Sequence, residues 1–281
     1  MLPGILSWGT ILTTVFLSAF FPVAAAFFII IFDLYWFLKT VYLSIHLREN
    51  WRRMKYNISQ NWRERLTNLR HEHLLHMVIL PFYDEGYEVV EKSVASLLLA
   101  NIDHKKIAVV LAAEKRAGQE AVDITRRVNE KYAHRFSYFL ITVHPDNLPD
   151  EMPGKGSNIS YAAEEARKKI LDAGKIPYEN VLVSAFDIDT VVYPEYFNCL
   201  AWHFLTVEHP YKASYQPVPV YNNNIWAAPA LSRVVATSGT FWQMIQQERP
   251  ERLATFSSHS IPFKPLYEGG YWQKNMVSED S

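Results

Sequence analysis

The chain has 281 residues, 49% of them hydrophobic, a formal net charge of −1 at pH 7 and one cysteine, Cys199. This length accommodates one sizeable globular domain and a smaller unit. The near-neutral charge argues against nucleic-acid binding, which requires a basic excess, and a single cysteine excludes an internal disulfide and a cysteine-based zinc cluster.

The first segment, residues 2–47, is apolar and contains only one aspartate and one lysine. About 20 apolar residues cross a bilayer, so this run is long enough for two crossings. Pro22 lies near its middle, and we therefore expect two transmembrane helices, at about 4–20 and 23–46, joined by a tight turn. One long kinked helix and a re-entrant first segment are the alternatives. A signal peptide is not favoured, because no basic residue precedes the run.

The next segment, residues 48–75, is basic and amphipathic. An excess of Lys and Arg beside a membrane helix marks the cytoplasmic side, so we expect the following domain to face the cytoplasm from the cell membrane. Apolar side chains at intervals of three and four predict one helix with an apolar face. That helix either lies on the membrane surface or packs on the domain. The apolar positions are Trp51, Met54, Ile58, Trp62, Leu66 and Leu69.

From residue 76 the chain alternates short apolar runs with amphipathic segments. Such alternation predicts βαβ units, and hence an α/β domain over residues 76–281 with a mainly parallel sheet and helices on both faces. The predicted strands are 76–81, 107–112, 136–143 and 181–186, and the predicted helices are 89–100, 119–133 and 158–173.

Beyond residue 190 the pattern is looser. We expect a helix at 195–207 and a second helix at 226–247 that is interrupted near Gly239. Residues 213–220 alternate but contain two prolines, which favours at most an edge strand. Ser257, Ser258 and His259 hint at hydrolase residues, but no G-x-S-x-G elbow accompanies them, and no role is predicted for them.

Two carboxylates, Asp187 and Asp189, end the fourth predicted strand. Side chains alternate along a strand, so both point the same way if the strand continues through them. Paired carboxylates repel each other and suit a hard cation such as Mg²⁺ or Mn²⁺, which keeps positions open for phosphate oxygens. This pattern predicts a metal–diphosphate site at the carboxyl edge of the sheet. The plain alternative is a polar turn after a strand, where Asp is common.

Other motifs follow the same order along the chain. Pro81-Phe82-Tyr83-Asp84-Glu85 ends the first strand, Ala113-Glu114 ends the second, and Gly154-Lys155-Gly156-Ser157-Asn158 precedes the third helix. Ser238-Gly239, Gly269-Gly270-Tyr271-Trp272 and Ser278-Glu279-Asp280 come after the acidic pair. Together these motifs resemble family-2 glycosyltransferases, in the membrane-bound branch that includes cellulose and hyaluronan synthases. The resemblance covers residues 76–281, with Asp84 in place of the family's Asn and Glu114 in place of its Asp.

The resemblance implies a GT-A nucleotide-sugar fold and an inverting, metal-dependent hexosyltransferase. The implied donor is a nucleoside diphosphate sugar, with a UDP-sugar expected, and the implied acceptor is a glycan or a lipid-linked sugar. The implied nucleotide-sugar residues are Pro81, Tyr83, Glu85, Glu114, Lys155, Gly156, Asn158 and Asp187. The implied acceptor-side residues are Ser238, Gly239, Gly270, Trp272 and Glu279.

The chemistry of the implied roles is consistent with these residue types. A divalent ion at Asp187 and Asp189 would neutralise the departing diphosphate, with Asp189 as the direct ligand. Lys155, before a helix, would meet a phosphate, aided by the positive end of that helix. Asp280 would be the catalytic base that takes the acceptor's hydroxyl proton. As plain alternatives, Lys155 is a solvated loop lysine and Asp280 a solvated C-terminal residue.

Two further functions remain open from the sequence. The first is transfer of a sugar to a polyprenyl phosphate. The second is a non-catalytic fragment that binds nucleotide or serves as a membrane scaffold. The chain ends before the Gln-x-x-Arg-Trp motif and further membrane helices that processive synthases carry, so we expect it to be truncated at its C-terminus.

Overall fold

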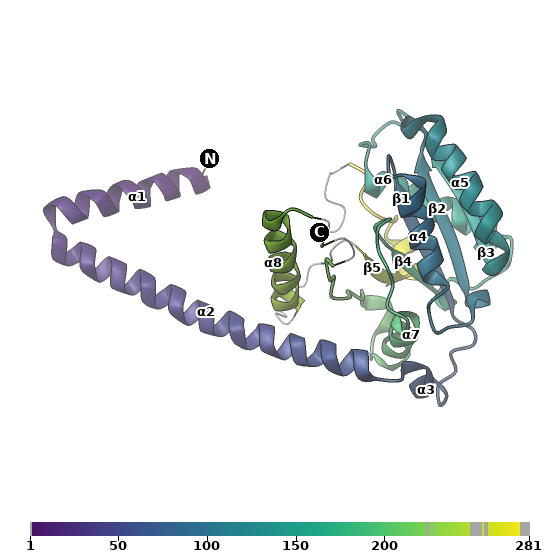
Figure 1. Cartoon of the computed structure of the whole chain (residues 1–281), viewed down its shortest axis with the longest axis horizontal. Coiled ribbons are helices and arrows are strands. Elements are labelled where there is room, and N and C mark those ends of the chain that lie inside the picture. The colour runs from purple at the N-terminus through teal and green to yellow at the C-terminus, as the bar shows by residue number, and fades with distance from the viewer. Residues whose placement is uncertain (1, 223–224, 227, 248–254, 256–257, 276–281) are drawn as a thin grey trace.

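A computed structural model describes the chain except for residues 1, 223–224, 227, 248–254, 256–257 and 276–281. It begins with two apolar helices, α1 (Leu2–Phe20) and α2 (Pro22–Ser59), which meet at Phe21 and form an open hairpin (Figure 1). Pro22 starts α2, where its missing N–H costs nothing. Within the described chain, both helices are long and apolar enough to cross a membrane, and 0% and 6% of their apolar windows are buried. The predicted division at Pro22 is therefore observed.

The predicted separate helix after residue 47 is not observed. α2 continues without a break to Ser59, because no Gly or Pro interrupts it, and a short helix α3 (Trp62–Leu66) follows. Trp62 and Leu66 are buried against α7 (Tyr196–Thr206), with the Trp62 and Trp202 ring centroids 5.2 Å apart. The predicted apolar face is therefore split. Its C-terminal part packs on the domain, whereas Trp51 on α2 stays exposed.

The globular domain is built on a five-stranded sheet with the order β3-β2-β1-β4-β5. The first four strands in this order are parallel, and β5 runs antiparallel beside β4. Every residue of β1, β2 and β4 is buried, as expected for strands covered on both faces. The bounds are β1 (Leu75–Phe82), β2 (Ile107–Glu114), β3 (Tyr138–His144), β4 (Val181–Ala185) and β5 (His259–Pro262).

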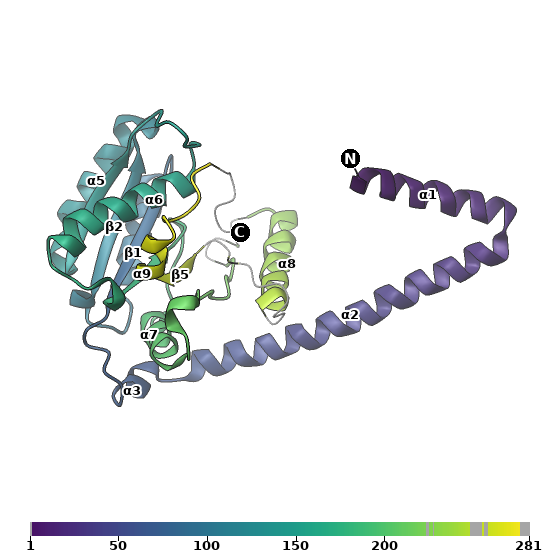
Figure 2. The ribbon, with the colours of Figure 1, turned by 180° about the vertical axis from the view of Figure 1, so that it is seen from behind.

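Helices cover both faces of this sheet (Figures 1 and 2). α4 (Tyr87–Leu97) and α5 (Gly118–Tyr132) pack on one face, and α6 (Lys155–Ala166) and α9 (Phe263–Glu268) pack on the other. The predicted α/β fold class, with a mainly parallel sheet, helices on both faces and preceding apolar helices, is confirmed. A π-helical turn, Arg167–Asp172, extends α6. Short 3₁₀ turns lie at His104–Lys106, Lys115–Ala117, Ala133–Arg135, Tyr178–Asn180 and Pro210–Lys212.

The C-terminal part differs from the predictions in one strand and one helix. Residues 213–220, predicted as at most an edge strand, form no strand, and their pairing is an isolated bridge from Tyr215 to Ser260, because the two prolines lack the N–H that a ladder requires. The strand at the edge beside β4 is β5, which the sequence pattern did not indicate. The helix α8 (Ala230–Gln247) runs through Gly239 without interruption.

Candidate active site

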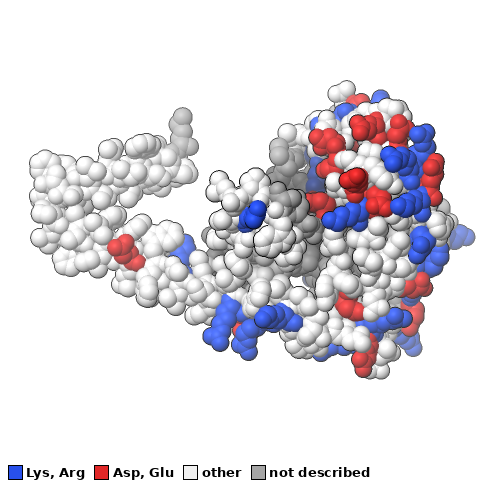
Figure 3. All heavy atoms as spheres, in the orientation of Figure 1, with Lys and Arg blue, Asp and Glu red and all other residues white. Residues whose placement is uncertain are grey.

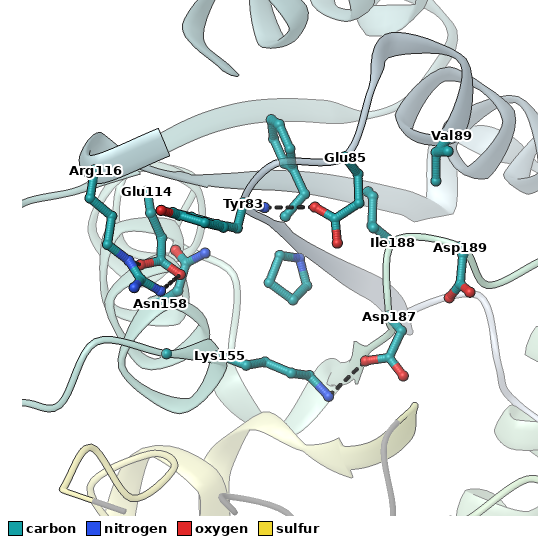
Figure 4. A pocket seen from close by; sticks show the side chains of 13 residues that line it. Tyr83, Glu85, Val89, Glu114, Arg116, Lys155, Asn158, Asp187, Ile188 and Asp189 are labelled. Atoms are coloured by element: carbon teal, nitrogen blue, oxygen red, sulfur yellow. Dashed lines mark hydrogen bonds and ion pairs between the residues drawn. The ribbon is translucent and has the colours of Figure 1, made fainter. Parts of the chain in front are cut away.

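A cavity of about 620 Å³ opens at the carboxyl ends of β1, β2 and β4. Seven of the eight predicted nucleotide-sugar residues line it, and so does Asp189 (Figure 4). The eighth, Gly156, is buried inside α6. The parallel topology explains this convergence, because strands that run the same way end at the same edge of the sheet.

The acidic pair lies in a turn and not on the strand. β4 ends at Ala185, and the Asp187 carbonyl accepts a hydrogen bond from the Thr190 N–H at 2.9 Å. The strand thus ends close to its predicted limit at residue 186, and the condition that it continues through Asp187 and Asp189 is not met. Both side chains nevertheless lie at the same end of the cavity (Figure 4).

A lysine faces this turn from the opposite wall. Lys155 is the first residue of α6, and its Nζ lies 2.9 Å from Oδ1 of Asp187. The positive end of α6 therefore opens into the cavity together with a lysine side chain. Positive charge from both sources favours an anionic group at this position.

The far end of the cavity combines an aromatic ring with an ion pair. Glu114, the last residue of β2, is buried, and its Oε1 accepts from Nη2 of Arg116 at 3.1 Å while Oε2 accepts from Nε. The hydrogen bond to Glu114 raises the pKa of Arg116. The guanidinium carbon of Arg116 lies 4.4 Å from the centroid of the Tyr83 ring. The Glu85 carboxylate accepts from the Tyr83 N–H at 2.8 Å and so holds this ring's loop in place.

Asn158 places a hydrogen-bond acceptor in the cavity wall. Its side chain is 1% exposed, and its Nδ2 donates to the carbonyl of Ala112 at 2.9 Å. This bond fixes the amide orientation, because two facing carbonyl oxygens would repel. Its Oδ1 is buried and has no hydrogen-bond partner among the residues that the structure describes. Buried acceptors are normally paired, but this oxygen is not exposed to the cavity and offers no contact to a ligand in the present arrangement of side chains.

Ser258 supports the acidic turn, although the sequence indicated no role for it. Its hydroxyl oxygen accepts from the Asp187 N–H at 3.1 Å and lies 3.1 Å from Oγ1 of Thr190. The adjacent His259 is buried in β5, and its Nε2 accepts from the indole N–H of Trp272 at 3.2 Å. The Trp272 carbonyl in turn accepts from the Ser160 hydroxyl at 2.9 Å. Trp272 is therefore a buried link between β5 and α6.

The other predicted acceptor-side residues are spread over two regions. Gly270 lies in the turn after α9 with a φ of 80°, which suits glycine. Ser238 and Gly239 lie within α8, and a Cβ atom at Gly239 would meet the Tyr221 ring at 3.3 Å. Burial and the negative charges of Asp187 and Asp189 raise the pKa of Tyr221. Tyr221 therefore connects α8 to the acidic turn.

Metal binding at this site depends on the two carboxylates. Within the described residues, no group of three or more His, Cys, Asp or Glu side chains is arranged to hold a metal ion. Mg²⁺ and Mn²⁺ bound to phosphates use few protein carboxylates, so Asp187 and Asp189 fit an ion whose remaining ligands come from a diphosphate. The predicted base Asp280 and the predicted acceptor-side residue Glu279 lie outside the described residues.

The solved structures to which this chain is similar include a mannosyltransferase and TarS. The mannosyltransferase PcManGT from Pyrobaculum calidifontis, in complex with GDP-Man and Mn²⁺, is 13% identical with a TM-score of 0.49, over 86% of this chain and 59% of that one. TarS 1–349 from S. aureus is 15% identical with a TM-score of 0.39, over 74% of this chain and 52% of that one. The chain thus spans little more than half of either structure. No protein-family model and no curated protein matches the sequence.

Proposed function

We propose that the chain is a membrane-anchored glycosyltransferase of the GT-A type, which moves a sugar from a nucleoside diphosphate sugar to a glycan or lipid-linked acceptor. One observation carries this proposal. A single cavity contains an aromatic ring and a buried acid at one end, and a lysine, a helix N-terminus and two carboxylates at the other. The aromatic end suits the base of a nucleotide, and the end with the lysine and the carboxylates suits its diphosphate.

The groups at the diphosphate end would stabilise the negative charge of the leaving group. Lys155 and the start of α6 would bind the phosphate oxygens, and Asp187 and Asp189 would hold Mg²⁺ or Mn²⁺. A bound divalent ion acts as a Lewis acid that stabilises the negative charge on the departing diphosphate. Asp187, which pairs with Lys155 at 2.9 Å, would contact the metal ion as well as the lysine.

The base end accounts for nucleotide binding. Tyr83 offers a ring face on which a base stacks, and Glu114 with Arg116 offers an acceptor and a donor at its edge. A uracil or guanine ring, each with an N–H beside a carbonyl, suits such a pair of groups, which keeps a UDP-sugar among the expected donors.

We assign the role of catalytic base to Asp280. Inversion requires a base that takes the acceptor's hydroxyl proton as the oxygen attacks the anomeric carbon. We assign this role to Asp280 on its match to the family motif. We also propose that α1 and α2 anchor the domain on the cytoplasmic side of the cell membrane, since Lys and Arg cluster just after the apolar run.

The proposal is tested by sugar transfer in reconstituted membranes. The full chain is supplied with UDP- or GDP-sugars, Mn²⁺, and either an oligosaccharide or a polyprenyl phosphate acceptor. Asp189→Asn and Asp280→Asn should each abolish product, whereas Asp123→Asn, an exposed carboxylate on α5, should not. Product at the wild-type rate in Asp189→Asn would contradict the metal role. Nucleotide binding without product in the wild type would favour a non-catalytic protein.

A further inference from the structure

One face of α8 is apolar and open to the surroundings. Leu231, Val235 and Trp242 are 77%, 65% and 49% exposed, and Val234 beside them is also exposed. The spacings of four and seven residues place Leu231, Val235 and Trp242 in one stripe along the helix. We call these four side chains the α8 stripe.

The buried part of α8 contains both polar and apolar side chains. Thr240, Gln243, Met244 and Ile245 are buried, and the Thr240 hydroxyl oxygen accepts from the Tyr221 N–H at 3.4 Å. Gln247 donates from Nε2 to the Pro217 carbonyl at 2.9 Å. A helix on a water-exposed surface normally turns its large apolar side chains inward and polar ones outward. The open α8 stripe departs from this arrangement and therefore indicates that an apolar medium covers it.

The position of α8 identifies that medium. α8 contacts α2 and lies on the side of the domain that faces the α1–α2 hairpin, with its axis steeply inclined to that of α2 (Figures 1 and 2). If α2 crosses a bilayer, a helix at this inclination runs along the bilayer surface. The helix α2, which α8 contacts, also exposes apolar side chains.

The charges on this side of the molecule agree with a bilayer surface. Figure 3 shows a largely uncharged surface over α8 and the hairpin, and a group of Lys and Arg side chains where α2 approaches the domain. Arg48, Arg52 and Arg53 follow the apolar run directly. Basic side chains at that level complement anionic phospholipid headgroups. Exposed tryptophans, here Trp226 and Trp242, are typical of the boundary between headgroups and acyl chains.

We propose that α8 is an interfacial helix, whose stripe inserts into the headgroup–acyl boundary of the phospholipid bilayer that α1 and α2 enter. The inference rests on the proposed membrane anchoring. It adds a second attachment to the bilayer, through a helix whose Thr240 hydroxyl oxygen accepts from the Tyr221 N–H.

The test measures the lipid contact of α8 directly. In a Cys199→Ala background, single cysteines replace Val235 on the stripe, Phe27 on α2, or Glu130 on α5, and each carries an environment-sensitive fluorophore. The proteins are placed in nanodiscs of anionic phospholipid, with or without a spin label just below the headgroups. Retained nucleoside diphosphate binding shows that each labelled protein is folded.

The proposal predicts that the probe at 235 emits at shorter wavelength than the probe at 130 and loses intensity with spin-labelled lipid. If the probe at 235 emits like the probe at 130 while the probe at 27 is quenched, α8 is not an interfacial helix. The proposed membrane anchoring by α1 and α2 would then still hold. A short-wavelength signal at 235 without lipid quenching means that protein covers the stripe, which also overturns the inference. An unquenched probe at 27 refutes the membrane anchoring itself, and the inference with it.

Discussion

The ammonium nitrogen of Lys155 lies 2.9 Å from the carboxylate oxygen Oδ1 of Asp187. This ion pair joins the first residue of α6 to the turn after β4, across the end of the cavity that we assign to the diphosphate. Among the described residues, Lys155 and the two carboxylates Asp187 and Asp189 line this end of the cavity. Neighbouring carboxylates favour a cation between them, and the lysine favours an anionic ligand beside it.

Replacing Lys155 should weaken donor binding. A hydrogen bond to a charged group contributes about 1.5–3 kcal/mol, so Lys155→Met should raise the Kd for a nucleoside diphosphate about ten- to hundredfold. Lys155→Arg should recover part of this loss. Lys168→Met, an exposed lysine just beyond α6 that pairs with Glu164, is the matched control. Equal Kd values for the Lys155 and Lys168 variants in a calorimetric titration would remove Lys155 from the phosphate site.

Tyr83 should bind the base through its ring and not through its hydroxyl. Stacking of a base on an aromatic side chain contributes about 1–3 kcal/mol, so Tyr83→Ala should weaken nucleoside diphosphate binding by about five- to hundredfold. Tyr83→Phe keeps the ring face and should bind like the wild type. The same titration measures both variants. If Tyr83→Phe loses as much affinity as Tyr83→Ala, the hydroxyl is the binding group and the stacking role is wrong.

Ser258 should matter for activity more than for stability. Its hydroxyl oxygen holds the Asp187 N–H, and the loss of one such hydrogen bond costs about 1 kcal/mol. Ser258→Ala should therefore lower kcat/KM about fivefold and lower the melting temperature by no more than about 2–4 °C. Ser59→Ala, at the end of α2, removes an exposed serine hydrogen bond away from the cavity and serves as control. Unchanged kcat/KM in Ser258→Ala would show that the turn does not need this support.

His76 should make the domain less stable in mild acid. Burial, with a smaller contribution from the positive charge of Lys106, lowers the pKa of His76 from 6.5 to about 3. The unfolded chain then binds a proton below pH 6.5 that the folded chain does not, so stability is full above pH 6.5 and falls towards pH 3. Between pH 6.5 and 5 this amounts to about 2 kcal/mol.

Chemical denaturation at several pH values checks this prediction. His76→Leu should be less sensitive to acid than the wild type over pH 6.5 to 5, because its side chain does not titrate. The comparison uses the change with pH and not the absolute stability, since the substitution also alters packing against Phe197. An identical pH slope in both proteins would show that His76 titrates equally in the folded and unfolded chains.

The strands of the parallel sheet were predictable because they are buried on both faces. β1, β2 and β4 are nearly continuous apolar runs, and their predicted limits agree with the structure to within one or two residues. β5 was not predictable in this way, because His-Ser-Ile-Pro carries no apolar pattern and becomes a strand only by pairing with β4. Likewise, Gly239 indicated an interruption, whereas the helix around it continues through α8.

The candidate site was predictable where the topology brings residues together. Glu114 ends a parallel strand, and Tyr83 and Asp187 come just after two others, so their meeting at one edge follows from the fold class. Ser258 was missed because it reaches the Asp187 turn from 71 positions further along the chain, and no local pattern signals such a contact. Arg116 was missed because its position over Tyr83 depends on side-chain geometry alone.

The most direct test of the proposed function is a titration of UDP and GDP into the full chain in nanodiscs, with Mn²⁺ or with a chelator. We predict that at least one of them binds, about tenfold or more tightly with Mn²⁺, and that Asp189→Asn removes the effect of the metal. The Asp123→Asn control should keep it. A wild-type chain that binds neither nucleotide, or binds equally well with and without the metal, would contradict the assignment of this cavity to a metal–nucleotide complex.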